Sequence, residues 1–148
     1  MKASDLMTAS HLWACVDESD CREVAQMMAQ HDVGAIPVLD KMGRLEGIVT
    51  DRDMCCRLIA KGGSFETPVR EIMTKNVRTV QPGTDLKEVE RIMKDGRVRR
   101  LPVTDQDNRL EGFIAVADLL RHCHGAMHEH EIVGMLETIC EPTSEPHE

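Results

Sequence analysis

Thr50 and Asp53 are the polar residues of this chain whose types and spacing most directly suggest a local role. They stand three positions apart and follow the strand expected at residues 45–49. In such a pair at a helix start, the hydroxyl accepts a hydrogen bond from a backbone N–H of the first turn and the carboxylate accepts one in return. This capping box alone stabilises a helix by about 1 kcal/mol. Asp118 has similar surroundings, but Ala115 replaces the threonine, so only the first helix start carries a hydroxyl.

Arg97, Arg99 and Arg100 form a basic cluster in a chain whose net charge is −8. Alternation along a strand would place Arg99 and Arg100 on opposite faces. One interpretation is a solvated face that pairs with nearby acidic side chains, namely Glu88, Glu90 and Asp95. The other is an anion site, which depends on the resemblance described below.

Histidines gather near the C-terminal end, at His122, His124, His128 and His130. On a helix His124 and His128 would be four residues apart, a spacing that lets two imidazoles share a metal ion. Gly125 follows His124 and no glutamate stands beside it, so a catalytic zinc motif is not expected. We predict polar helix surface here and assign no metal ligand.

No group of residues predicts catalysis. There is no nucleophile elbow and no Gly-rich phosphate loop, and nothing in the sequence would activate the adjacent cysteines Cys55 and Cys56. The chain has six cysteines but no C-x-x-C pair, which favours reduced thiols over a disulfide framework or a zinc ribbon. We therefore predict no catalytic residue and no required cofactor.

The composition excludes several classes of partner. The net charge of −8 opposes binding to nucleic acid and to anionic lipid, because both need positive charge at the interface. No segment approaches the roughly eighteen apolar residues of a membrane span, and the first thirty residues lack a signal-peptide pattern. The expectation is a cytoplasmic protein with no nucleic-acid or membrane partner.

The chain is an internal duplication. Residues 28–55 reappear without a gap as residues 93–120, and the opening residues 5–8 (DLMT) correspond to residues 71–74 (EIMT). These matches predict a first repeat at residues 1–63, a second repeat at residues 64–125, and a C-terminal helix and disordered tail at residues 126–148.

Each repeat should fold as strand, helix, strand, strand, helix. Short apolar runs at residues 12–16 and 77–80 predict the first strands, and Trp13 lies in one of them. The following helices, with Ser19 and Thr84 as expected N-caps, carry one apolar stripe each: Cys21, Val24, Met27 and Met28, then Leu86, Val89, Ile92 and Met93.

The remaining elements follow from turn residues. Strands at residues 35–39 and 45–49 should form an antiparallel hairpin, with Gly43, and Asn108 in the second repeat, in a left-handed conformation. Pro37 and Pro102 lack a donor and are expected at a strand start or edge. Closing helices are expected at residues 51–61 and 116–124, with a further amphipathic helix at residues 127–139.

The duplicated unit resembles the CBS domain, named for cystathionine beta-synthase, and two in tandem resemble a Bateman module of the stand-alone bacterial type. The motifs that carry the resemblance are VGAIPVLD (33–40), GIVTDRD (47–53), VRRLPVTD (98–105) and GFIAVAD (112–118). The resemblance covers residues 5 to about 123. It implies an α/β fold of two CBS repeats packed as one pseudo-twofold module.

In that family the Gly, apolar, any, Thr or Ser, any, any, Asp or Asn pattern commonly lines an adenosine nucleotide site. The resemblance therefore implies that Asp53 binds the ribose and Thr50 assists. A carboxylate can accept hydrogen bonds from both hydroxyls of a ribose diol, each worth roughly 1.5–3 kcal/mol.

The second repeat departs from this pattern, because Asp118 keeps the acceptor while Ala115 removes its hydroxyl partner. We therefore expect a weaker second site. In nucleotide-binding members, basic residues just before this strand reach the phosphates, which implies phosphate contacts for Arg99 and Arg100.

The leading hypothesis is a regulatory, non-enzymatic module that binds AMP, ADP, ATP or a similar molecule between the repeats. It would signal to an unknown protein partner through a change of shape or association. One alternative is a structural or redox-linked dimeric interaction module without a ligand, and another is a metal-responsive sensor that uses the His-rich tail. A homodimer is expected, since the closing helices supply apolar surface: Met54, Cys55, Cys56, Leu119 and Leu120.

Overall fold

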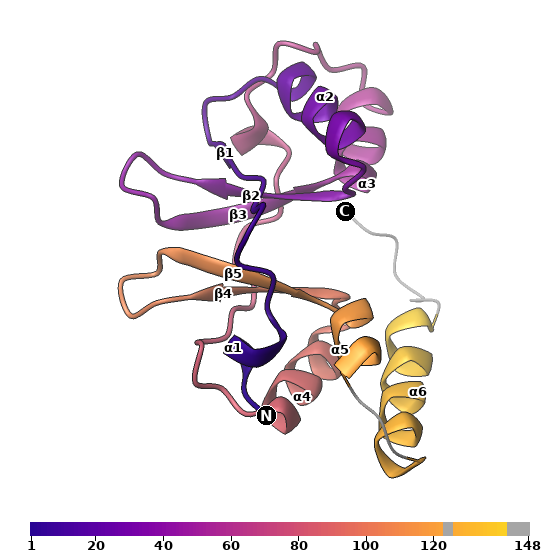
Figure 1. Cartoon of the computed structure of the whole chain (residues 1–148). Helices are drawn as coiled ribbons and strands as arrows, with labels where there is room; N and C mark the ends of the chain where they lie inside the picture. Colours follow the sequence, from indigo (N-terminus) through magenta and orange to yellow (C-terminus); the bar gives the residue numbers. More distant parts are fainter. Residues whose placement is uncertain (123–125, 142–148) are drawn as a thin grey trace. The chain divides into compact units, whose positions relative to one another are not determined.

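The computed structural model describes residues 1–122 and 126–141 (Figure 1). They form two compact units. The first-repeat unit comprises residues 11–77 and 104–110, and the second-repeat unit comprises residues 1–10, 78–103, 111–122 and 126–141. The first ten residues thus fold with the second repeat, although they open the first one in sequence.

The first-repeat unit contains a three-stranded sheet. Its elements are β1 (Cys15–Val16), α2 (Cys21–His31), β2 (Ala35–Leu39), β3 (Leu45–Thr50), α3 (Asp51–Asp53), η1 (Met54–Ile59) and η2 (Val69–Glu71). The strand order is β1-β2-β3, with β1 and β2 parallel and β2 and β3 antiparallel.

The second-repeat unit repeats this plan with a shorter sheet. Its elements are α1 (Ala3–Leu6), α4 (Leu86–Gly96), β4 (Arg100–Thr104), β5 (Leu110–Ala115), α5 (Val116–His122) and α6 (Ala126–Cys140). β4 and β5 pair as a two-stranded sheet, and the residues of their turn belong to the compact first-repeat unit. The mixed α/β fold predicted from the sequence is confirmed.

The apolar stripes of α2 and α4 pack into the cores as predicted, with Met27 and Ile92 partly buried, but their caps differ from the prediction. The N-caps are Asp20 and Asp85, and Asp20 accepts a hydrogen bond from the backbone of Glu23 at 2.8 Å. Ser19 and Thr84 belong to the preceding turns, where the Thr84 hydroxyl accepts from the backbone of Gln81 at 3.0 Å.

The expected first strands are shorter than predicted. Only β1 (Cys15–Val16) forms in the first repeat, and in the second repeat Val80 makes a single parallel bridge to Val103. An apolar run alone does not fix strand length. The neighbouring strand must also offer backbone partners, and here it offers them over a short stretch only.

Pro37 and Pro102 lie third in their strands and not at a strand start. Pro102 is on an edge strand, which the prediction also allowed, because β4 and β5 form a two-stranded sheet, whereas Pro37 is on the middle strand of its sheet. Ile48, opposite Pro37, makes backbone hydrogen bonds to Thr74 instead of β2. The nitrogen of Pro37 therefore faces the β1 side, where pairing begins only at Val38. The lack of a backbone N–H at Pro37 therefore removes no hydrogen bond between the strands.

The two hairpin turns are built alike. Gly43 and Asn108 have φ values of 80° and 62°, which confirms the predicted left-handed residue. Asp40 accepts from the backbone of Met42 and Arg44 at 2.8 and 2.9 Å, and Asp105 makes the equivalent two bonds. An aspartate at the turn entrance and a residue that tolerates positive φ together define the turn.

The opening segment of each repeat crosses to the sheet of the other repeat. Thr8 pairs with Phe113 on β5, and Thr74 pairs with Ile48 on β3. A Cβ atom on Gly47 would lie 2.6 Å from the carbonyl oxygen of Thr74, and Gly112 faces the side chain of a methionine in the same way. The matched glycines leave room for the matched crossing segments.

The closing helix of the first repeat is not a regular α-helix. α3 passes into the π-helical turn η1, and Gly62, with φ of 70°, follows its end. Met54 and Leu119 are buried in the two cores, so the prediction that they supply dimer surface is wrong. Cys55, Cys56 and Leu120 are exposed.

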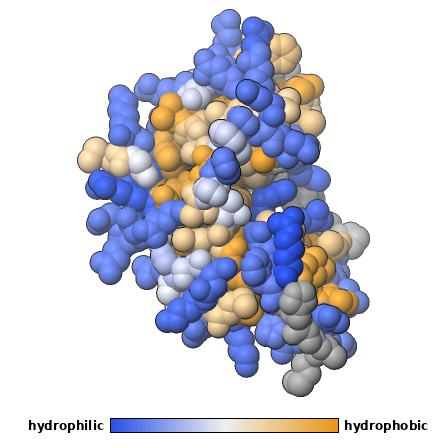
Figure 2. Space-filling model, viewed as in Figure 1, coloured by the Kyte–Doolittle hydropathy of each residue, from blue (hydrophilic) through white to orange (hydrophobic). Residues whose placement is uncertain are grey.

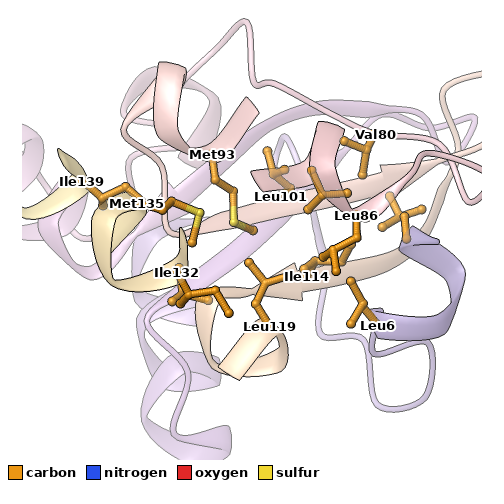
Figure 3. Packing of buried hydrophobic residues seen from close by; sticks show 14 residues of the cluster. Leu6, Val80, Leu86, Met93, Leu101, Ile114, Leu119, Ile132, Met135 and Ile139 are labelled. Carbon is orange, nitrogen blue, oxygen red and sulfur yellow. The ribbon is translucent and has the colours of Figure 1, made fainter. Parts of the chain in front are cut away.

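The predicted C-terminal helix is confirmed as α6, and it is part of a core. Ile132, Met135 and Ile139 are buried with residues of α4 and α5. In Figure 3 the side chains of Ile132 and Met135 point toward Leu119 and Met93. The predicted disorder of the last residues lies outside the described residues, apart from Glu141.

Most of the surface seen in Figure 2 is hydrophilic, with smaller hydrophobic areas between polar side chains.

Candidate functional site

Thr50 and Asp53 form a complete capping box at the start of α3. The Thr50 hydroxyl accepts from the Asp53 backbone at 3.1 Å, and Asp53 Oδ2 accepts from the Thr50 backbone at 2.9 Å. Asp53 Oδ1 lies 3.5 Å from Nε of Arg57, and the Asp53 residue is 7% exposed. The backbone of Asp51 donates to the carbonyl of Gly34, which fixes this helix start beside the entrance of β2. The predicted cap is confirmed.

Asp118 has the same position in the second repeat, with half of the cap. Its Oδ2 accepts from the Ala115 backbone at 2.7 Å, its Oδ1 lies 3.6 Å from Nη1 of Arg121, and the residue is 9% exposed. Ala115 has no hydroxyl to return the bond. Each carboxylate oxygen has two lone pairs, so both aspartates keep acceptor capacity beyond these contacts.

Arg99 and Arg100 stand at the entrance of β4 and are both exposed. The carbonyl of Arg99 accepts from the backbone of Val116 at 3.0 Å, which ties this arginine to the start of α5, the helix that carries Asp118. Arg99 also donates to Sγ of Cys140 at 3.7 Å. The structure therefore groups Arg99, Arg100 and Asp118 in the second-repeat unit, and Thr50 and Asp53 in the first-repeat unit.

One interpretation of the sequence paired this basic cluster with nearby acidic residues. The ion pairs among the described residues show that this interpretation is wrong. Glu88 and Asp95 both pair with Arg91, at the exposed surface of α4. Arg97 instead lies 3.6 Å from a carboxylate oxygen of Glu141.

A surface pocket of about 660 Å³ lies in the first-repeat unit, away from the predicted residues. It is lined by Glu46, Arg70, Glu71, Met73, Lys75 and Asn76. Burial raises the pKa of Glu46, and the nearby Asp17 carboxyl raises it further by a smaller amount. Because the lining mixes both signs of charge, the pocket alone indicates no particular ligand.

Two groupings were missed by the sequence analysis. The ring of Trp13 stacks on His31, with centroids 3.4 Å apart and planes 6° apart. On α4, Glu90 lies beside His128 of α6. Burial raises the pKa of Glu90, and the nearby His128 lowers it by a smaller amount. Both contacts join elements far apart in sequence, so no local spacing could reveal them. His124, the expected neighbour of His128, lies outside the described residues.

The described cysteines differ in access. Cys15 and Cys21 are buried, whereas Cys55, Cys56 and Cys140 are exposed, and all five have free thiols. Burial raises the pKa of the Cys15 thiol to about 12, with a smaller contribution from Asp17. A buried thiol with a raised pKa is a poor nucleophile.

Comparison with known proteins agrees with this architecture. A family model described as the CBS domain matches residues 3–59 and 69–125. The chain belongs to the CBS domain family. CBS domain-containing protein YhcV of Bacillus subtilis is 42% identical over 98 residues, which are 66% of this chain and 69% of YhcV. Hypoxic response protein 1 of Mycobacterium tuberculosis is 34% identical over 142 residues, which are 95% of this chain and 94% of that protein.

Solved structures of CBS domain proteins match as well. Hypoxic response protein I, crystallised with two coordinated zinc ions, aligns with a TM-score of 0.76 and 30% identity, over 84% of this chain and 100% of that chain. CBSX2 in complex with AMP aligns with a TM-score of 0.72 and 26% identity, over 81% of this chain and 93% of that chain. The predicted tandem of two CBS domains is confirmed.

Within the described residues, none of the helices has both the length and the apolar character that a bilayer span requires.

Proposed function

We propose that this CBS pair is a regulatory, non-catalytic module that binds an adenosine nucleotide such as AMP, ADP or ATP. The observation that carries the proposal is the duplicated helix-start carboxylate, Asp53 in one repeat and Asp118 in the other, in a family with an AMP-bound member. Each carboxylate is held in a fixed orientation by a backbone donor and retains acceptor capacity for ribose hydroxyls.

The two helix starts are proposed to bind unequally. Thr50 supplies a hydroxyl beside Asp53, whereas Ala115 supplies none beside Asp118. Two charge-assisted hydrogen bonds to a ribose diol are together worth about 3 kcal/mol or more. Their loss would weaken the binding of a micromolar ligand about a hundredfold or more, at about 1.4 kcal/mol per tenfold.

Arg99 and Arg100 are proposed to contact the phosphate groups. Their guanidinium groups belong to exposed residues, and an arginine fork can bind phosphate oxygens in a bidentate manner. If so, replacing both by alanine should weaken AMP binding and leave the binding of uncharged adenosine nearly unchanged.

Calorimetric titration of ligand-free protein with AMP tests the proposal. Asp53→Asn keeps the size of the side chain and an oxygen that can accept from the Thr50 backbone, but it removes the charge. It should weaken binding strongly, and Asp118→Asn should weaken it much less. The proposal fails if wild-type protein binds no adenosine nucleotide, or if only Asp118→Asn abolishes binding.

We also propose that the nucleotide biases association or shape, which an unidentified protein partner detects. A ligand can shift such an equilibrium only by its difference in affinity for the two states. Light scattering with and without AMP tests the expected homodimer, for which Ile59 and Leu120 offer exposed apolar side chains. Thermal unfolding measured with an oxidant and with a reductant tests the redox-linked alternative.

A further inference from the structure

An unsatisfied acid–imidazole pair lies between α4 and α6 in the second-repeat unit. Oε1 of Glu90 and Nε2 of His128 are 3.6 Å apart. Both atoms are buried, and within the part of the chain that the structure describes neither has a hydrogen-bond partner. Buried polar atoms are nearly always satisfied in native proteins, so two facing exceptions require a cause.

Glu131 adds a third potential ligand atom, an oxygen, to this pair. One ligand atom from each of Glu90, His128 and Glu131 lies within 4.8 Å of the other two. His128 and Glu131 are three residues apart on α6, a spacing that places both side chains on one helix face. Glu131 is exposed, so an ion could reach the three residues from solvent and keep a water ligand.

The separation of Glu90 and His128 suits a shared metal ion better than a direct hydrogen bond. At 3.6 Å it exceeds the usual range of N–H···O bonds, about 2.7–3.2 Å. Two ligands at roughly 2.0–2.2 Å from one zinc ion, in tetrahedral geometry, lie about 3.3–3.6 Å from each other. One ion placed between the two atoms would therefore bind both with little movement of either side chain.

The charges also favour a cation. Two carboxylates converge on one imidazole. A divalent ion compensates both charges and takes its nitrogen ligand from the neutral imidazole. Imidazole with carboxylate oxygen is a ligand set of zinc and related transition metals.

We propose that Glu90, His128 and Glu131 bind a divalent transition-metal ion, with Zn²⁺ as the best match, and that the ion fastens α6 to α4. The consequence is structural, because α6 contributes Ile132 and Met135 to the core of this unit. Metal binding would thus stabilise the packing of the C-terminal helix. The inference stands independently of nucleotide binding, since it involves none of the proposed nucleotide residues.

The test is titration of the full chain with ZnCl₂ after chelator treatment and desalting, followed by calorimetry and thermal unfolding. Wild type should bind one ion per chain at this place and melt at a higher temperature with zinc. Glu90→Gln and Glu131→Gln should each weaken this binding by roughly tenfold or more, about 1.4 kcal/mol. Glu131→Gln changes an exposed residue, so it tests the site even if a change at Glu90 disturbs folding.

His130→Gln is the matched control, because His130 is an exposed histidine on the same helix outside the cluster. This variant should bind zinc as the wild type does. With Co²⁺ in place of zinc, the visible absorption of the wild-type complex should fall in Glu131→Gln and persist in His130→Gln. The proposal is overturned if zinc does not change the melting temperature, if both glutamate variants bind like wild type, or if only His130→Gln loses the ion.

Discussion

Ala115→Thr should stabilise the protein, because it completes the cap that the second repeat lacks. Asp118 already accepts from the Ala115 backbone at 2.7 Å, and a threonine hydroxyl could accept from the Asp118 backbone, as Thr50 does from Asp53 at 3.1 Å. Ala115 is half-buried at the end of β5, where a β-branched residue is well tolerated.

The magnitude follows from known caps. A hydroxyl cap is worth about 1 kcal/mol relative to alanine. In a chain of this size that corresponds to a melting temperature raised by about 2–4 °C. The reverse change, Thr50→Ala, should lower the melting temperature by a similar amount. Far-UV circular dichroism during heating measures both.

Ala117→Thr is the control for this experiment. Ala117 is exposed, one residue inside α5, where a threonine cannot cap and lowers helix propensity by roughly 0.5 kcal/mol. The reasoning is refuted if Ala115→Thr and Ala117→Thr have the same effect, or if Thr50→Ala leaves the melting temperature unchanged.

Three further perturbations test the packing. Deletion of residues 126–148 should lower the melting temperature strongly, since burying each large side chain is worth roughly 1.5–3 kcal/mol, whereas deletion of residues 142–148 should have little effect. Gly47→Ala should destabilise in chemical denaturation, because its Cβ would lie 2.6 Å from a carbonyl oxygen, whereas Gly83→Ala has open space and should not. Burial raises the pKa of Cys15 from 9.0 to about 12, so stability that is fully present below pH 9.0 should fall as pH rises toward 12. The slope for one thiol is about 1.4 kcal/mol per pH unit, and Cys15→Ala should remove it in denaturation curves at pH 8 and pH 10.

The sequence was sufficient for several structural features that depend on residues close together in the chain. The turns at Gly43 and Asn108, the buried stripes of α2 and α4, and the cap at Thr50 are of this kind. In each case a side chain bonds to nearby backbone, or an apolar period follows one helix face. Such features repeat because the local sequence repeats.

Most features that the sequence missed depend on contacts between distant segments, and the N-caps of α2 and α4 are a local exception. The opening segment of the second repeat can cross to β3 because Gly47 leaves room for Thr74. α6 becomes part of a core because Ile132 packs with residues of α4 and α5. The Glu90–His128 pair joins two helices that no local pattern connects. The nucleotide residues were chosen by motif, and the structure confirms the local geometry at Asp53 while their ligand role remains a proposal.

A crystal structure of the ligand-free protein soaked with AMP tests the central proposal most directly. We predict the 2′ and 3′ oxygens of the ribose within hydrogen-bonding distance of the Asp53 carboxylate, and weaker or no density for a nucleotide at Asp118. AMP bound at another place, with the Asp53 carboxylate still in contact with Thr50 and Arg57 and not with the ligand, would contradict this prediction.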